Sequence, residues 1–342
     1  MYNQQSRIRL KIVVGKAPHF LELELPYFKK YFDVVDDCDD ETVVLAYAPD
    51  VLEYAASLPG RLRTAVIFPG FGFRPYCEPL DRAFLTGLID KYYELVFVNP
   101  GPMEESFRET EKLVVHPFCI DLARIPFKRP RQQLNSLLHA SAIGSMKKDW
   151  MRSVRAMQQT GLKWEIFPPR PLVDEQNNVI ESLKTNSIVY KFRNQLLRWR
   201  NRYWHAIYRR TLKLGLPPMM LPVGYLSHDM LIKRYQQYDG FVHIAKHNLP
   251  ATDAKYTATL LEAGATGSLL FWHDTLGLGN DFETIFNLPL NPTQAAKEIL
   301  HIRQNVNIEQ HSRQTAEEIR DRCNPDSVMR IRLAAIENAL NV

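Results

Sequence analysis

The stretch from Tyr256 to Asp274, "YTATLLEAGATGSLLFWHD", joins a helical apolar pattern to an apolar strand pattern. Gly264 and Gly267 stand between the two patterns. A helix that ends at glycine and leads into a short buried strand is half of an α/β unit. Glu262 is the single carboxylate within the helical part, and its presence in an otherwise apolar unit needs an explanation.

Short apolar runs alternate with helical patterns through the first third of the chain. The runs "RLKIVVG", "TVVLAYAPD", "RTAVIFPGFG", "ELVFVNPG" and "EKLVVHPF" are typical of strands, and helical stretches lie between them. Short strands separated by helices predict βα units and a mostly parallel sheet. Such sheets bind their ligands at the carboxyl ends of the strands, so we expect a site at that edge.

A second α/β series follows the basic, proline-containing segment "FKRPRQQ" at 127–133, which we interpret as a linker. Its strand patterns include "SLLHASAIG" and "DGFVHIAK", and helical patterns close the chain at about 308–322 and 325–340. The sequence therefore predicts an α/β fold with two Rossmann-like domains.

The composition is that of an ordinary globular protein, with 45% hydrophobic and 24% charged residues among 342. A formal net charge of +5 is too small over this length to indicate nucleic-acid binding by itself. The four cysteines lie far apart without a CxxC pair, which predicts reduced thiols in a cytoplasmic protein. No apolar run reaches the roughly 18 residues of a membrane span.

Three segments resemble GT-B glycosyltransferases of the retaining group 1, or family 4, type. The segment "VVHPFCIDLARIPFKRP" is similar to their hinge, with its outline kept at Pro117, Ile120, Asp121 and Phe127. The segment "SAIGSMKKDW" is similar to the start of their second domain, although Ser145 stands where an arginine is usual. The third segment, "LLEAGATGSLLFW", resembles the helix that carries a Glu-x7-Glu motif in that family.

The resemblance implies two Rossmann-like domains that face each other across a cleft. Residues 1–130 would form the acceptor-side domain, and 131–324 would form the nucleotide-sugar-binding domain with a basic helical insertion at about 175–215. The helix at 325–342 would pack back on the N-terminal domain.

The same resemblance implies a donor site in the C-terminal half. Glu262 fits the second glutamate of the motif, where a carboxylate would accept hydrogen bonds from both ribose hydroxyls. Helix N-termini and cations favour a diphosphate, so the other expected donor-binding residues are Gly144, Ser145, Lys147, Lys148, Lys255, Tyr256 and Thr257. The first glutamate of the motif would fall at Ala254 and is missing, with Asp253 one position away.

The acceptor side of the cleft offers fewer signals. Gly15, Lys16, Gly70 and Asp253 are expected to line the sugar or acceptor cleft. His19 would be the general base of an inverting enzyme, because its ordinary pKa suits proton transfer. A retaining enzyme can use the donor's own phosphate instead, and the sequence leaves both stereochemical outcomes open.

These features predict a transferase that moves a sugar from a nucleotide-sugar to a glycan or lipid-linked acceptor, in polysaccharide or glycoconjugate biosynthesis. A nucleotide-sugar epimerase of the same fold and a non-catalytic nucleic-acid-binding protein are the alternatives. We expect no cofactor and no metal, because the acidic run "DDCDDE" at 36–41 is better explained as a solvated turn.

A basic stretch at 189–213 interrupts the α/β pattern with arginines, lysines and an aromatic stripe at helical spacing. Such a helix can lie on an anionic membrane surface, or its stripe can pack on the protein's own core. Arginine interleaved with tryptophan and tyrosine can also contact nucleic acid, although we expect no such partner. The predicted location is cytoplasmic, with peripheral attachment to the membrane as an expectation.

Overall fold

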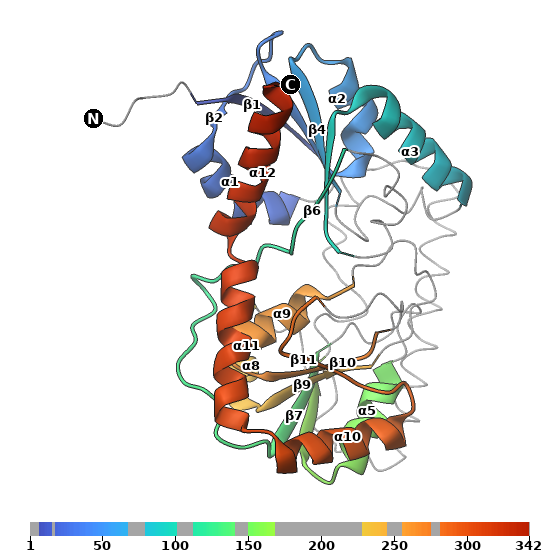
Figure 1. Cartoon of the computed structure of the whole chain (residues 1–342), viewed down its shortest axis with the longest axis vertical. Coiled ribbons are helices and arrows are strands. Elements are labelled where there is room, and N and C mark those ends of the chain that lie inside the picture. The colour runs from blue at the N-terminus through green and yellow to red at the C-terminus, as the bar shows by residue number, and fades with distance from the viewer. Residues whose placement is uncertain are drawn as a thin grey trace, which may run out of the picture.

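The computed structural model of the protein describes residues 7–15, 18–67, 79–100, 112–140, 150–167, 228–244, 255–274 and 281–341. It confirms the expected α/β class with two parallel sheets, each covered by helices on both faces (Figure 1). The sheets lie one after the other along the long axis of the molecule. The basic stretch at 189–213 lies outside the described residues.

The first sheet has the described strand order β2-β1-β3-β4-β5-β6, and every neighbouring pair is parallel. After β1 the chain adds β2 on one side and then continues on the other side with β3, so the switch point lies between β1 and β3. The strands are β1 (Arg9–Val14), β2 (Asp33–Val34), β3 (Val43–Tyr47), β4 (Leu62–Ile67), β5 (Leu95–Val98) and β6 (Leu113–Val115).

Two pairs of helices cover the first sheet. One face packs on α1 and α12 through residues such as Phe28 and Met329, and the other packs on α2 and α3 through residues such as Ala55 and Ile89. These elements are α1 (Pro18–Tyr31), η1 (Pro49–Val51), α2 (Leu52–Ser57), α3 (Pro79–Tyr92) and α12 (Pro325–Leu340).

The second sheet repeats this plan with the described order β11-β10-β9-β7-β8. Its switch point lies between β7 and β9. Helices α8, α9 and α11 cover one face, and α5 and α10 cover the other. The strands are β7 (Ser136–Ala140), β8 (Lys163–Phe167), β9 (Gly240–His243), β10 (Leu269–Trp272) and β11 (Ile285–Asn287). The helices are α5 (Trp150–Gln159), α8 (His228–Gln237), α9 (Ala258–Ala265), α10 (Pro292–Asn305) and α11 (Ile308–Arg322).

The unit α9–β10 forms as its sequence predicts. Thr257 caps the helix by accepting a hydrogen bond from the Leu260 amide at 3.3 Å. At the other end Gly267 adopts φ +84°, and the amides of Gly267 and Ser268 bond back to carbonyls of the last turn, as in a Schellman motif. Gly264 allows close packing, since a Cβ there would lie 2.7 Å from the Leu270 side chain.

In the described part of the chain, two segments connect the two sheets. The first is the irregular segment that follows β6, and the second is the junction of α11 and α12. They meet where the Ile120 amide donates to the Cys323 carbonyl at 3.2 Å. Helix α12 then runs beside α1 on the first sheet, whereas α11 lies on the second (Figure 1).

A buried ion pair attaches α12 to the first sheet. Arg332 donates to Glu24 of α1 through Nη1 at 2.5 Å and through Nη2 at 3.2 Å, and both side chains are almost fully buried. The Tyr47 hydroxyl donates to the same carboxylate at 2.9 Å. The Arg332 Nε donates to His116 Nε2 at 3.2 Å. The guanidinium group of Arg332 is therefore hydrogen-bonded to residues of α1 and of the segment after β6.

The tautomer of His116 follows from these contacts. A guanidinium only donates hydrogen bonds, so His116 Nε2 is the acceptor and Nδ1 carries the proton that is donated to the Pro117 carbonyl at 2.8 Å. Burial, and then the charge of Arg332, lower the pKa of His116 to about 3. The imidazole is therefore neutral in the folded protein at ordinary pH.

None of the helices in the described part of the chain is long and apolar enough to cross a bilayer.

Replacing Glu24 by glutamine should lower the free energy of unfolding by about 3–5 kcal/mol, because Arg332 would remain buried without its counter-charge. Urea unfolding monitored by circular dichroism measures this loss. The matched control is Lys30→Gln, which removes the exposed Lys30–Asp326 pair between the same two helices and should change stability far less. Equal effects of the two variants would contradict the role of the buried pair.

The stability of the fold should depend on pH through His116. Between pH 3 and about 6.5 the unfolded chain binds a proton at this residue that the folded chain does not. The contribution of His116 is thus complete above about pH 6.5 and is lost as the pH falls, by at most about 1.4 kcal/mol per pH unit. In urea unfolding across this pH range, the free energy of unfolding of His116→Gln should change less with pH than that of the wild type. The exposed His301→Gln should keep the wild-type slope, and an unchanged slope in His116→Gln would refute the assignment.

Candidate functional site

The two halves of the chain meet at the carboxyl edge of the first sheet. Pro100, two residues beyond β5, accepts a hydrogen bond through its carbonyl from the Lys255 amide at 2.9 Å. Lys255 lies two residues before Thr257, the cap of α9, and this helix is on the side of the second sheet toward the N-terminal half (Figure 1). The start of α9 is therefore placed beside the edge at which doubly wound sheets bind ligands.

The switch point of the first sheet is tightly built at this edge. Gly15 follows β1, and its amide donates to the Tyr47 carbonyl at the end of β3 at 2.9 Å. A Cβ on Gly15 would lie 2.3 Å from Asp50 Oδ1 and 2.8 Å from the Ala48 Cβ, so only glycine fits. Ala48 itself has φ +114°, a conformation that costs energy in a residue with a side chain. Strained backbone next to a glycine marks this turn as a candidate part of the site.

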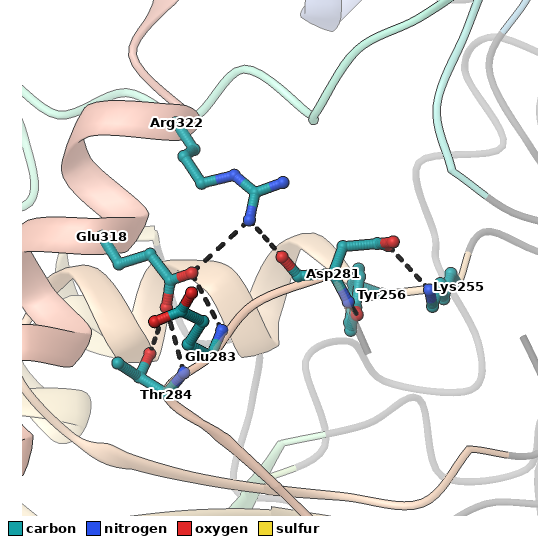
Figure 2. Close-up of polar contacts among 7 residues, drawn as sticks. All are labelled: Lys255, Tyr256, Asp281, Glu283, Thr284, Glu318 and Arg322. Atoms are coloured by element: carbon teal, nitrogen blue, oxygen red, sulfur yellow. Dashed lines mark hydrogen bonds and ion pairs between the residues drawn. The ribbon is translucent and has the colours of Figure 1, made fainter. Parts of the chain in front are cut away.

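The start of α9 is held by two contacts with Asp281 (Figure 2). The Lys255 ammonium lies 2.8 Å from the Asp281 carboxylate, and the lysine side chain is only 3% exposed. The Tyr256 hydroxyl accepts from the Asp281 amide at 2.8 Å, while its ring packs on Trp272 and Phe282. Both residues are thus anchored within the protein, and the positive charge of Lys255 already has a carboxylate partner.

Helix α11 in turn fixes the segment that carries Asp281. Glu318 accepts from the amides of Glu283 and Thr284 at 2.9 and 3.1 Å, and from the Thr284 hydroxyl at 2.7 Å (Figure 2). Arg322 donates to the Asp281 carbonyl and stacks 4.4 Å from the Phe282 ring. A continuous set of polar contacts therefore runs from the end of α11 to Lys255 and Tyr256, just before the cap of α9.

Glu262 lies on the accessible face of α9. Positions 258, 259 and 262 are partly exposed, whereas most of the other helical positions are buried. Residues three and four apart share one face of a helix, so the carboxylate belongs to the open face that begins at the capped N-terminus. Burial, and then the charge of Glu262, raise the pKa of Tyr235 on α8, which places the two side chains in electrostatic reach.

Side-chain contacts hold the described strand ends at the switch point of the second sheet. Ser153 of α5 accepts from the Ile244 amide at 2.7 Å and donates to its carbonyl at 3.0 Å, just beyond β9. His139 and His243 stack with their ring centroids 5.6 Å apart and are both buried. His243 is thus a core residue, and these contacts rigidify the strand ends that lead toward the proposed donor region.

The described residues include part of the set expected from the sequence. Gly15, Lys255, Tyr256, Thr257 and Glu262 are described, and the last four cluster at α9. His19 lies in α1, but its side chain is not described. The expected residues that lie outside the described ranges are Lys16, Gly70, Gly144, Ser145, Lys147, Lys148 and Asp253.

Asp281 and Glu318 were not expected from the sequence. Neither carries a motif, and each acts on residues that are distant in the chain. No pattern in the sequence indicated either residue; the burial of Lys255 in the structure is what requires a carboxylate partner, because a buried ammonium is costly without one.

Among the described residues, no group of three histidine, cysteine, aspartate or glutamate side chains could hold a metal ion. The acidic run at 36–41 forms an exposed turn. Within it Asp39 accepts from the Thr42 hydroxyl at 2.7 Å and the Glu41 amide at 3.1 Å, and it pairs with Arg9.

Comparison with solved structures finds this two-sheet arrangement in glycosyltransferases. HepE from Anabaena, in complex with UDP-glucose, matches at a TM-score of 0.62 and 12% identity over 98% of this chain and 100% of that chain. An α,α-trehalose-phosphate synthase (UDP-forming) from Burkholderia vietnamiensis matches at a TM-score of 0.54 and 8% identity over 100% of both chains. TarM matches at a TM-score of 0.54 and 11% identity over 94% of this chain and 58% of that chain.

These similarities establish that the chain has the GT-B fold, as its motifs suggested. No protein-family model matches the sequence, and no curated protein matches it.

Replacing Asp281 by asparagine should lower the free energy of unfolding by about 1–3 kcal/mol, because the buried Lys255 ammonium loses a charged hydrogen-bond partner. Thermal and urea unfolding measure the change. Asp321→Asn makes the same chemical change at an exposed position of α11 and should leave stability nearly unaltered. A stable Asp281→Asn protein would show that the network in Figure 2 does not hold the start of α9.

Proposed function

We propose that the protein is a glycosyltransferase that uses a nucleotide-sugar donor. The observation that carries this proposal is the GT-B fold, which matches HepE over almost the whole length of both chains. HepE was solved with UDP-glucose and with UDP, so a UDP-sugar is the first donor class that we propose for this chain.

The open face of α9 supports a donor site in the C-terminal half. Glu262 is partly exposed there, four residues after the helix begins. A carboxylate can accept hydrogen bonds from two neighbouring hydroxyl groups at once, as a ribose presents them. This role would explain why one acid stands in an otherwise apolar α/β unit.

The N-terminus of α9 supports a place for the diphosphate. The amide groups of a first helical turn and the helix dipole favour negative charge. In glycosyl transfer the bond between the anomeric carbon and the diphosphate oxygen breaks, and the diphosphate leaves with increased negative charge. Hydrogen-bond donors held at that oxygen stabilise the developing charge and lower the activation barrier. The contacts of Asp281 with Lys255 and Tyr256 would keep this helix end in position before the donor binds.

The finer assignments are parts of the proposal. We infer a glycan or lipid-linked acceptor in polysaccharide or glycoconjugate biosynthesis, and transfer with retention, from the motif resemblance. The turn at Gly15 supports an acceptor side in the N-terminal half. It lies at the carboxyl edge of the first sheet, where the backbone at Gly15 packs closely against Ala48 and Asp50. Contact of 189–213 with an anionic membrane stays a prediction.

Replacing Glu262 by alanine should weaken UDP binding about 10- to 100-fold, because a lost hydrogen bond to a charged group costs about 1.5–3 kcal/mol. Isothermal titration calorimetry with UDP, GDP, ADP and CMP measures the affinity and identifies the preferred base. Glu317→Ala removes an exposed acid from α11 and should bind as the wild type does. An unchanged affinity in a folded Glu262→Ala protein would reject the ribose contact, and the absence of binding by every nucleotide would reject the donor site.

Glycosyl transfer should not need a divalent metal, because helix ends and cations can neutralise a diphosphate without one. Activity measured as UDP release should survive treatment with EDTA at saturating donor concentration. Activity that disappears with EDTA and returns with magnesium or manganese would contradict this prediction.

A further inference from the structure

A cavity of about 700 Å³ opens at the amino edge of the second sheet. Its walls are the segment before β7, the first residue of β8 and the end of α8, which all lie at the opposite end of the strands from α9's N-terminus. Strand β7 has five residues, which corresponds to roughly 16 Å. The cavity is therefore separate from the proposed donor site.

The lining of this cavity is strongly basic. Four cationic side chains, Arg129, Arg131, Lys163 and Arg234, face a single carboxylate, Asp239, which gives a net charge of 4 − 1 = +3. Four glutamine side chains add neutral hydrogen-bond donors. A concave surface with one sign of charge attracts small anions.

The carboxylate of Asp239 is engaged at the start of β7. Its Oδ2 accepts from the Asn135 amide at 2.9 Å, the Ser136 amide at 2.9 Å and the Ser136 hydroxyl at 2.8 Å. Three donors from the start of β7 thus hold the charged oxygen. The role of this carboxylate is to bind the first backbone amides of β7.

The side chain of Arg131 is held in one position in the wall of the cavity. It donates through Nε to the Tyr238 carbonyl at 3.0 Å and through Nη2 to the Tyr235 carbonyl at 2.9 Å, where α8 ends. Burial lowers the pKa of Arg131, Asp239 raises it, and the neighbouring Arg129 lowers it again. A bound anion would compensate this concentration of positive charge.

Two of the cations are available to a ligand. Within the part of the chain that the structure describes, neither Arg129 nor Lys163 forms an ion pair with a carboxylate. Lys163 lies 5.4 Å from the centre of the Tyr238 ring, and Arg129 is exposed. Arg234 lies 3.9 Å from Glu165, whose same oxygen accepts from the Tyr238 hydroxyl. Arg234 also donates to Gln237 Oε1 at 3.2 Å, so Arg129 and Lys163 are the cations offered to a ligand and Arg234 adds positive charge beside them.

We propose that this cavity binds a small ligand through phosphate groups, with the charge of a pyrophosphate. The guanidinium group of Arg129 presents donors with the geometry that phosphate oxygens accept bidentately, and Arg131, Lys163 and Arg234 add positive charge around it. Cavities of roughly 300–1,000 Å³ suit small molecules. The phosphate can belong to a free metabolite or to a phospholipid headgroup, and the experiment separates these two sources.

Calorimetric titration with inorganic pyrophosphate at low salt tests the proposal. We expect saturable binding that weakens with added salt and that falls at least 10-fold in the combined variant Arg129→Gln, Lys163→Gln and Arg234→Gln. The matched control removes the same number of cations at exposed positions outside the cavity: Arg155→Gln, Lys233→Gln and Lys297→Gln. The control variant should bind as the wild type does. Arg131 stays unchanged in both, since its replacement would disturb α8.

A second arm separates this site from the donor site and identifies the ligand's source. The cavity variant should lose pyrophosphate binding and keep the Glu262-dependent binding of UDP; pyrophosphate binding that the cavity variant retains would place the ligand elsewhere and overturn the proposal. Flotation with phosphatidylglycerol vesicles, against phosphatidylcholine vesicles, tests the headgroup source. The phosphate site is supported if either probe binds the wild type and the combined cavity variant does not bind it. Binding to neither probe, or equal binding by the cavity variant, overturns it.

Discussion

The buried contact between Glu24 and Arg332 is the constraint on which the arrangement of the two halves depends. It joins the first helix of the chain to the last, 308 residues apart. An arginine without its carboxylate would be very costly in this position, because both groups are removed from water. The pair is satisfied only when α12 lies on the first sheet, with Tyr47 and His116 completing the hydrogen bonds. Since α12 follows α11 directly, the same contact determines how α11 and the second sheet follow the first.

The position of α9 depends on this arrangement. Helix α11 ends next to α12, and its Glu318 and Arg322 hold the segment that contains Asp281. Asp281 in turn holds Lys255 and Tyr256 at the start of α9, and the Lys255 amide bonds to Pro100 beyond β5. The edge of the first sheet and the capped end of a helix from the second half are thus brought together. The GT-B fold requires such a meeting of two halves before a donor and an acceptor can react.

Much of this could be predicted from the sequence, and the rest could not for physical reasons. The pattern around Gly264 and Gly267 identified α9 and β10, because helix capping and strand burial are local properties. The strands β2 and β11 were missed, since two or three residues do not establish a periodicity. No pattern in the sequence indicates that Glu24 is buried, and its ion pair with Arg332 forms only when α12 returns to the first sheet. Lys255 was expected to be open to a phosphate, but its side chain is buried beside Asp281. The two residues are 26 positions apart, and no motif links them.

The most direct test of the glycosyltransferase proposal is whether the protein cleaves a UDP-sugar. The full-length chain is incubated with a panel of UDP-sugars and a mixture of glycan and lipid-linked acceptors, and the products are measured by mass spectrometry. The account predicts that one donor releases UDP, that its sugar appears on an acceptor or free in solution, and that Glu262→Ala slows the release. Recovery of every donor intact, or conversion of a donor into its epimer without release of UDP, would contradict the account.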